Sequence, residues 1–349
     1  MYGAAAVATE CLLRDLFQVR VWKALDPLDP NDFITISARL SAALRGATAG
    51  IEGQSLSAAI QSLDVNWPDM SDAGRDKIIA AARNEIAGMA TPIADAASPV
   101  LETAAGRIIP ATKTRTVGKF GLDIPEGLGE LDTETGSLLR LSQMVYIKDQ
   151  FGVRADRFDT MAKDIVASGL EQGLGRDDIS GNLATKLSDY NVERSPNYWN
   201  LISTDFANKA RTTTQLHAFG EAGITKYRFD AILDEATSSI CRLLHGRVFS
   251  VKKAADRSMK ALNLTDPEKI KQVRPWVNAG KDESGKDVLY YNGAGGTQHN
   301  VADVDENVEG EKDKIGKYSN VLSNKQLEAA GVTVPPCHGS CRSTITTEE

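Results

Sequence analysis

Two short windows near the end of the chain hold three of its four cysteines and two of its four histidines. The first is Cys241-Arg-Leu-Leu-His245, and the second is Cys337-His338-Gly-Ser-Cys341. If the first window is helical, Cys241 and His245 share a helix face, because residues i and i+4 are neighbours there. Thiolates and imidazoles are the ligands of tetrahedral zinc sites. The five side chains are therefore candidate ligands of a metal ion, with zinc as the ion that suits them.

The same side chains allow three other interpretations. Free cysteines are among the most buried residues, so Cys241 could simply belong to the core. Two of the thiols could form a disulfide once the protein leaves the reducing cell, and the imidazoles could hydrogen-bond nearby turns. Neither window has the C-x2-C spacing that is typical of zinc sites. The pattern therefore predicts that the two windows lie close in space and leaves the metal open.

A small α+β region is expected to position these windows. Residues 227–233 alternate in polarity, which predicts a strand, and further strands are expected near residues 247–251, 288–291 and 342–346. The basic run at 251–262 predicts a helix. The Gly-rich and acidic stretch at 292–314 predicts a loop.

Four polar residues around the windows have expected structural roles. Asp234 and Thr237 follow the first strand, where either could cap the helix that carries Cys241. Arg211 and Arg342 are suited to bidentate pairing with a carboxylate, and Asp234 is the candidate acceptor.

The earlier part of the chain has the pattern of helices. Ser71 is a plausible N-cap in front of Ile78, Ala82 and Ile86, which recur at helical spacing. Residues 103–121 carry several glycines, Pro110 and only basic charges, which predicts a solvated connector, whereas Ser195-Pro196 predicts the start of a long helix.

We therefore expect a mostly α N-terminal region followed by a small α+β C-terminal domain. The expected parts are an alanine-rich helical region at 1–110, a linker at 111–136, a helical middle region at 137–223 and an α+β domain at 224–349.

Composition narrows the class of protein. The 349 residues include 40 Lys or Arg and 47 Asp or Glu, which gives a net charge of −7. A protein that coats nucleic acid usually has a strong basic excess, so this role is disfavoured. The sequence has neither an apolar run long enough to span a membrane nor the features of a signal peptide. We expect synthesis in the cytoplasm and no membrane partner.

The C-terminal part of the chain resembles a known family. Three segments carry the resemblance: Arg211-Thr-Thr-Thr, the run from Tyr227 through Asp234, Thr237, Cys241 and Gly246 to Phe249, and Pro335-Pro336-Cys337-His338-Gly-Ser-Cys341-Arg342-Ser343. Together they look like the phage Mu F-type minor head proteins of the head-morphogenesis group in tailed phages and prophages. Family members often have cysteines where this chain has Ser238 and Ser343, and Cys337 is an additional thiol.

The resemblance implies a structural role in the virion. It implies a minor capsid protein made in the host cytoplasm, acting in head morphogenesis inside the capsid next to the portal, and ejected with the DNA as a further expectation. Its partners would be the portal protein, other capsid proteins, further copies of itself and packaged DNA. It also implies structural roles for Arg211, Asp234, Thr237, Gly246 and Arg342.

Two enzymatic alternatives remain open from the sequence. A Cys/His metal-dependent nuclease would use the two windows, with His299 or Glu235 as general base. An ADP-ribosyltransferase would use Arg194, a strand at Ser203-Thr204 and the Glu309-Gly-Glu311 pair, in that order.

Overall fold

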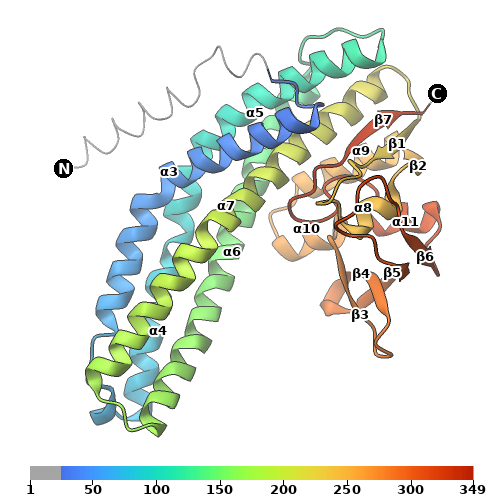
Figure 1. Ribbon diagram of the computed structural model, residues 1–349. Coiled ribbons are helices and arrows are strands. Elements are labelled where there is room, and N and C mark those ends of the chain that lie inside the picture. The colour runs from blue at the N-terminus through green and yellow to red at the C-terminus, as the bar shows by residue number, and fades with distance from the viewer. Residues whose placement is uncertain (1–24, 349) are drawn as a thin grey trace. The chain divides into compact units, whose positions relative to one another are not determined.

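The computed structural model describes residues 25–348, apart from the side chains of residues 189–195 (Figure 1). Cys11 and the helix expected at the start of the chain lie outside these residues. The described chain divides into two compact units. The first contains Ser41–Val100 and Gln143–Trp199, and the second contains residues 25–40, Leu101–Ser142 and residues 200–348. The candidate site residues from Arg211 onward all belong to the second unit.

Helices account for the described residues up to the first strand. Their bounds are α3 Pro30–Ser62, η1 Trp67–Asp69, α4 Asp72–Gly88, α5 Ala90–Phe120, α6 Glu130–Glu171 and α7 Arg176–Glu221. Ser71 caps α4 as expected, because its side chain accepts a hydrogen bond from Gly74 N. The buried face of α4 includes Ile79, rather than Ile78, with Ala82 and Ile86. No helix in the described part of the chain is long and apolar enough to cross a membrane.

The predicted connector at 103–121 is wrong, because α5 continues through it to Phe120. Of the predicted linker at 111–136, only residues 121–129 lie outside helices. The helix persists through Pro110 because one of its faces is buried, as Leu101, Ala104 and Ile108 show. Tertiary packing of this kind outweighs the weak helix propensity of glycine and proline.

The prediction that a helix starts at Ser195-Pro196 is also wrong, because α7 runs continuously across Pro196. The expected capping group of Ser195 lies on a side chain outside the described ones. Apolar residues are buried on both sides of the proline, with Leu183 and Leu187 before it and Trp199 and Ile202 after it. This packing explains why the helix tolerates a residue that removes a backbone donor.

Two small antiparallel sheets and five short helices form the rest of the second unit. One sheet has the order β2-β1-β7 and the other β3-β4-β5-β6. The strands are β1 Lys226–Asp230, β2 Val248–Ser250, β3 Val277–Lys281, β4 Asp287–Asn292, β5 Gln298–Glu306, β6 Lys317–Ser319 and β7 Thr344–Thr347. The helices are α8 Ser239–Leu244, α9 Val251–Leu262, α10 Pro267–Val273, η2 Ala294–Gly296 and α11 Asn324–Ala330. The expected fold class is confirmed.

The strands β1, β2, β4 and β7 and the helix α9 lie where the sequence pattern placed them. In contrast, the loop expected at 292–314 contains strand β5. Its acidic residues are accommodated because the carboxylate of Asp303 accepts hydrogen bonds from Lys286, Asn300 and Asn320. Val301 and Ala302 provide the buried face of this strand.

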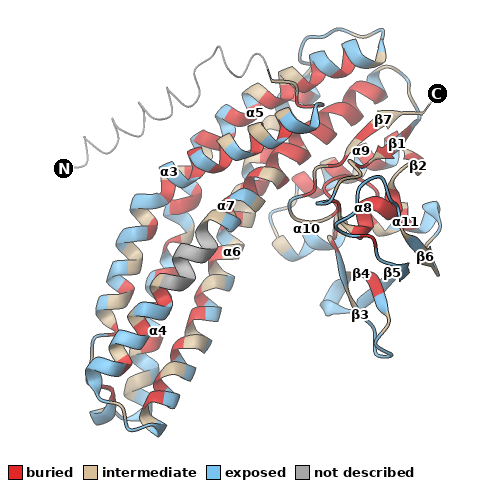
Figure 2. Cartoon of the chain, viewed as in Figure 1, coloured by how far each residue is buried: buried red, intermediate tan, exposed pale blue. Residues whose placement is uncertain are grey.

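The core of the second unit joins helix α7 to both sheets. Leu216 and Phe219 of α7 pack in one cluster with Phe229 of β1 and Ile345 of β7, and the thiols of Cys241, Cys337 and Cys341 are part of it. Residues 210–219 of α7 are all buried (Figure 2). A helix that is enclosed all round needs internal partners for its polar side chains.

A buried charge cluster joins three helices of this unit. The ammonium of Lys113 on α5 contacts Asp132 of α6 at 3.4 Å and also binds Glu221 of α7. Lys113 and Asp132 are almost completely buried, and Asp132 also accepts a hydrogen bond from Gly129 N at 3.0 Å. The residue that we expected on a solvated connector is therefore an internal cation.

Replacing this cation should destabilise the protein strongly. Lys113→Met keeps most of the aliphatic volume but leaves two carboxylates without their cation, so the free energy of unfolding should fall by about 3–5 kcal/mol. Urea denaturation measures this, and Lys77→Ala on the exposed side of α4 is the control, with an expected change of about 0.5 kcal/mol or less. A loss of less than about 1 kcal/mol for Lys113→Met would show that the cluster does not stabilise the fold.

Candidate metal centre

Three of the five predicted ligands meet in one buried cluster. The Sγ of Cys241 on α8 lies 3.3 Å from Nε2 of His338 and 3.7 Å from Sγ of Cys341. The two cysteines are buried, and the three potential ligand atoms all lie within 4.8 Å of one another. The two windows, separated by about a hundred residues of sequence, are therefore brought together by the fold.

The imidazole of His338 is oriented by the backbone. Its Nδ1 lies 2.8 Å from the carbonyl oxygen of Gly339. Because a carbonyl can only accept a hydrogen bond, Nδ1 carries the proton and Nε2 faces the two sulfurs. This is the arrangement found in most metal-binding histidines, in which the second nitrogen is held by a backbone or carboxylate oxygen.

Close packing requires glycine in the same turn. A Cβ at Gly339 would lie 2.8 Å from a methyl carbon of Leu201, so a larger residue would push the turn away from α7. The next residue, Ser340, adopts a positive φ of 61°. This tight turn allows His338 and Cys341 to face the same point.

The three groups share protons unequally. Burial opposes ionisation of Cys341, but hydrogen bonds from Cys241 and His338 outweigh it and hold the Cys341 pKa well below its usual value. The pKa of Cys241 is raised, first by its hydrogen bond with Cys341 and then by burial. Burial lowers the pKa of His338, yet its interactions with Cys341 raise it overall. The surroundings thus favour ionisation of Cys341 over ionisation of Cys241.

The other two predicted ligands do not join the cluster. Helix α8 ends at Leu244, and His245 leaves the helical conformation with ψ at 130°. The helical spacing on which we based its position therefore does not apply, and His245 Nδ1 accepts a hydrogen bond from Ala231 N at 3.1 Å. The thiol of Cys337 is buried and lies near the carbonyls of Val332 and Val334, at 3.5 Å and 3.7 Å.

Asp234 and Thr237 shape the turn that precedes α8. Thr237 Oγ1 accepts from Asp234 N at 3.0 Å and contacts a carboxylate oxygen of Asp234 at 2.9 Å, which closes the turn. Our prediction that one of them caps α8 is wrong, because the helix begins only at Ser239. The capping group is Glu309, whose Oε1 accepts from both the backbone N and the hydroxyl of Ser239, at 2.9 Å and 2.8 Å.

Arg342 pairs with Asp234, as expected. Its two terminal nitrogens donate to the two carboxylate oxygens at 2.9 Å and 2.5 Å. The Arg342 guanidinium is the main cause of a lowered pKa of Asp234. This pair links the residue after Cys341 to the turn before Cys241.

Arg211 does not use Asp234 as an acceptor. It is buried, and it donates to the backbone carbonyls of Pro27, Arg342 and Ser343 at 3.1 Å, 3.0 Å and 2.6 Å. The guanidinium of Arg211 thus binds carbonyls of backbone that forms neither helix nor strand. Gly246 ends the turn after α8 with a φ of 76°, which favours glycine, and donates to Phe229 O at 2.9 Å.

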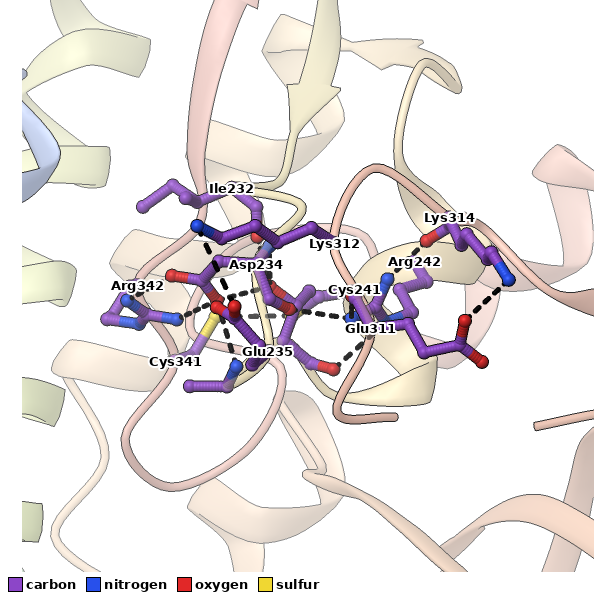
Figure 3. A network of polar contacts seen from close by, with 12 residues as sticks. Ile232, Asp234, Glu235, Cys241, Arg242, Glu311, Lys312, Lys314, Cys341 and Arg342 are labelled. Carbon is purple, nitrogen blue, oxygen red and sulfur yellow. Dashed lines mark hydrogen bonds and ion pairs between the residues drawn. The ribbon is translucent and has the colours of Figure 1, made fainter. Parts of the chain in front are cut away.

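Sequence reasoning missed Arg242, which is central to the site (Figure 3). Its side chain is completely buried and donates to the carbonyl oxygens of Thr237 at 3.0 Å, Asp234 at 2.6 Å and Glu311 at 2.7 Å, and also to that of Lys314. The available signal was a lone charge within the six-residue helix Ser-Ile-Cys-Arg-Leu-Leu, since an arginine inside a buried helix needs several acceptors.

A small pocket lies beside the cluster. Cys241 and His338 line it, together with Ser238, Arg342 and Ser343. Both serines that stand where the resembled family often has cysteine therefore face this pocket. It is the place where a fourth ligand, such as a water molecule, would complete a tetrahedron.

Comparison of the chain with known proteins found no similar protein. No family model, no curated protein and no solved structure matches this chain. The site must therefore be interpreted from its own chemistry. Two thiol groups and one imidazole with a fixed tautomer can hold a metal ion, and Cys241, His338 and Cys341 are the residues that would bind it.

The residues of the enzymatic alternatives lie elsewhere. Ser203 and Thr204 are within α7, so the strand that an ADP-ribosyltransferase needs does not form there, and the side chain of Arg194 is outside the described ones. His299 stacks on Tyr291 with ring centroids 5.0 Å apart, and Glu235 lies 3.7 Å from Lys312. Neither of these two proposed bases lines the pocket beside the cluster.

The pair between Asp234 and Arg342 should make stability depend on pH in the acid range. The pKa of Asp234 in the folded protein lies below 3.8, the ordinary value for an aspartate. The stability that the ion pair contributes is therefore complete above pH 3.8 and disappears as the pH falls through the lower pKa of the folded state. Asp234→Asn should lower the free energy of unfolding by about 1–3 kcal/mol at pH 7. Below about pH 4 the free energy of unfolding of this variant should fall less steeply with pH than that of the wild type.

Urea denaturation at several pH values tests this expectation. Asp256→Asn, which alters an exposed pair with Lys252, is the matched control and should change stability by about 0.5 kcal/mol or less. An acid decline as steep in Asp234→Asn as in the wild type would show that another group controls it.

Proposed function

We propose that this chain is a structural minor head protein of a tailed phage or prophage, whose C-terminal region is locked by a zinc ion. The observation that carries the proposal is the convergence of the segments that resemble the Mu F-type family. Cys241, His338 and Cys341 form one cluster, and Asp234 pairs with Arg342 directly beside it. The segments that carry the resemblance therefore lie together in this fold.

The contacts around the cluster favour a structural role. Arg242 binds four backbone carbonyls, Arg342 is committed to Asp234, and Glu309 caps α8. These side chains fix loops and the end of the chain to the strands and helices of the unit. We infer that the protein acts by presenting a stable surface to other head proteins.

Zinc is the ion that this donor set suits best. Two sulfurs and an imidazole nitrogen are soft to borderline donors, and a tetrahedral site with one further ligand fits them. Bound zinc would supply a cross-link between α8 and the final segment, and its binding free energy would add to folding stability. Cys241 and Cys341 would bind as thiolates and His338 through Nε2.

Metal analysis of variants tests the zinc site. Protein purified under reducing conditions should contain one zinc per chain by mass spectrometry of the metal, because three donors already lie within reach of one ion. Cys241→Ser and His338→Ala should lose the metal and unfold at lower temperature. Cys337→Ser is the matched control, a buried thiol that does not face the cluster, and should retain the zinc. Equal loss in all three variants, or a wild type without zinc, would contradict this part of the proposal.

The location in the virion requires a separate experiment. We propose that the protein lies inside the capsid next to the portal, contacts the portal or other capsid proteins, associates with further copies of itself, lies beside the packaged DNA and leaves with it. Purified heads should contain the chain, and deleting its gene should reduce particle yield or infectivity. Heads that lack the protein, or unchanged infectivity after deletion, would contradict the assembly role.

The pocket beside Cys241 and His338 favours one second candidate, a metal-dependent nuclease, because an open fourth position could hold a reactive water. A DNA-cleavage assay with zinc-loaded wild type and Cys241→Ser distinguishes the two functions. Cleavage by the wild type alone would favour the nuclease, and no cleavage by either would favour the structural role.

A further inference from the structure

We propose that Cys241 and Cys341 are an oxidation site, at which a hydroperoxide converts the two thiols into a disulfide that takes the place of the metal. This inference goes beyond the proposed assembly role and does not require it. Its basis is the contact between the two sulfurs, which are 3.7 Å apart in the buried cluster. A disulfide has a sulfur–sulfur distance of about 2.05 Å, so the two atoms need to approach by about 1.7 Å.

The third buried thiol is directed elsewhere. Cys337 Sγ lies 3.5 Å and 3.7 Å from the carbonyls of Val332 and Val334, as a donor to them. Within the described residues, Cys241 and Cys341 are the pair whose sulfurs contact each other. The geometry therefore selects one of the three pairings that these buried cysteines could form, including the pairing of Cys337 with its near neighbour Cys341.

One side of the site borders the small pocket. Cys241 and His338 line the small pocket, whose remaining wall includes Ser238 and Ser343. The pocket has a volume of about 10 Å³, enough for about one water-sized molecule, so a hydroperoxide enters only if the surrounding turn opens. Cys241 is the sulfur that lines this pocket, and Cys341 lies behind it.

The reaction balances with one hydroperoxide molecule. One of the two sulfurs attacks a peroxide oxygen, the O–O bond breaks, and the departing hydroxide takes a proton and leaves as water, which gives a sulfenic acid. The other sulfur then attacks the sulfenic sulfur, the S–O bond breaks, and this hydroxide takes a second proton, from the remaining thiol or from solvent, and leaves as a second water. The two sulfurs lose two electrons, and the two peroxide oxygens gain them.

The disulfide would preserve the connection that the metal provides. It consumes two of the three donors, so a bound metal ion is released, but it joins the same two residues on α8 and in the final segment. A chain that passes from a reducing to an oxidising environment would therefore keep its C-terminal segment attached. Metal and disulfide are alternative cross-links at one place in the fold.

Peptide mapping of the full-length chain tests the proposal. Zinc-loaded and chelator-treated wild type are exposed to one equivalent of hydrogen peroxide, alkylated without reduction and digested with trypsin. Cleavage after Arg228, Arg242, Lys325 and Arg342 gives peptide 229–242 with Cys241 and peptide 326–342 with both Cys337 and Cys341. Fragment ions that separate Cys337 from Cys341 identify the linked residue.

The expected product is the Cys241–Cys341 cross-link, reversed by dithiothreitol. Free thiols should fall from four to two, with release of zinc from the loaded sample. Cys337→Ser should give the same product. A cross-link mainly through Cys337, sulfinic acid without a cross-link, or no loss of thiols would overturn the proposal. Because mapping of the wild type decides, misfolding of a Cys241 variant would not matter.

The zinc content measured before oxidation separates this inference from the proposed function. Zinc without a cross-link would refute the oxidation site and leave the metal centre intact. A Cys241–Cys341 cross-link in protein that never binds zinc would support the oxidation site and refute the metal centre.

Discussion

The fold of the second unit depends on hydrogen bonds to the backbone of a largely buried segment that has no regular secondary structure. Residues 332–343 form no helix or strand, and most of them are buried, so unpaired carbonyls there would be costly. Helix α7 satisfies the end of this segment and the start of β7 with polar side chains on successive turns. Asn208 donates to the carbonyl of Cys341 at 2.7 Å, Arg211 to that of Ser343, and Gln215 to that of Ile345 at 3.0 Å. The enclosed polar residues of α7 are thus explained by the segment they hold.

Arginine is the recurrent means of holding such segments in this protein. Arg211 and Arg242 are buried, Arg274 is half-buried, and all three bind backbone carbonyls; Arg274 donates to those of Val334 and Pro335. The guanidinium offers five donors in a fixed plane, so one side chain can serve several carbonyls at once. Burial lowers the pKa of Arg211 to about 10, which still leaves it charged at neutral pH. Lysine, with a single donor atom, could not replace these contacts.

The sequence predicted what local pattern encodes and failed where tertiary contacts decide. The fold class, β1, β2, β4, β7, helix α9 and the proximity of the two Cys/His windows followed from alternation and spacing. The helices through Pro110 and Pro196 did not, since burial of their apolar faces outweighs proline. His245 was misplaced because a helix end is not visible in i, i+4 spacing. Glu309 was missed because its partner Ser239 lies 70 residues away, and Arg242 was missed because two of its four acceptors, the carbonyls of Glu311 and Lys314, lie 69 and 72 residues away.

The same contacts make metal binding and attachment of the final segment a single process. Asn208 and Arg211 hold the backbone at Cys341 and the two residues after it while Cys341 faces Cys241, although neither side chain contacts a ligand atom. Bringing together two residues about a hundred positions apart costs conformational entropy. The hydrogen bonds and the core packing of the folded chain offset this cost whether or not a metal is bound. By linkage, the free energy with which this packing strengthens metal binding equals that with which the metal strengthens the packing. Metal binding at the cluster therefore depends on whether the final segment of the chain is packed against α7.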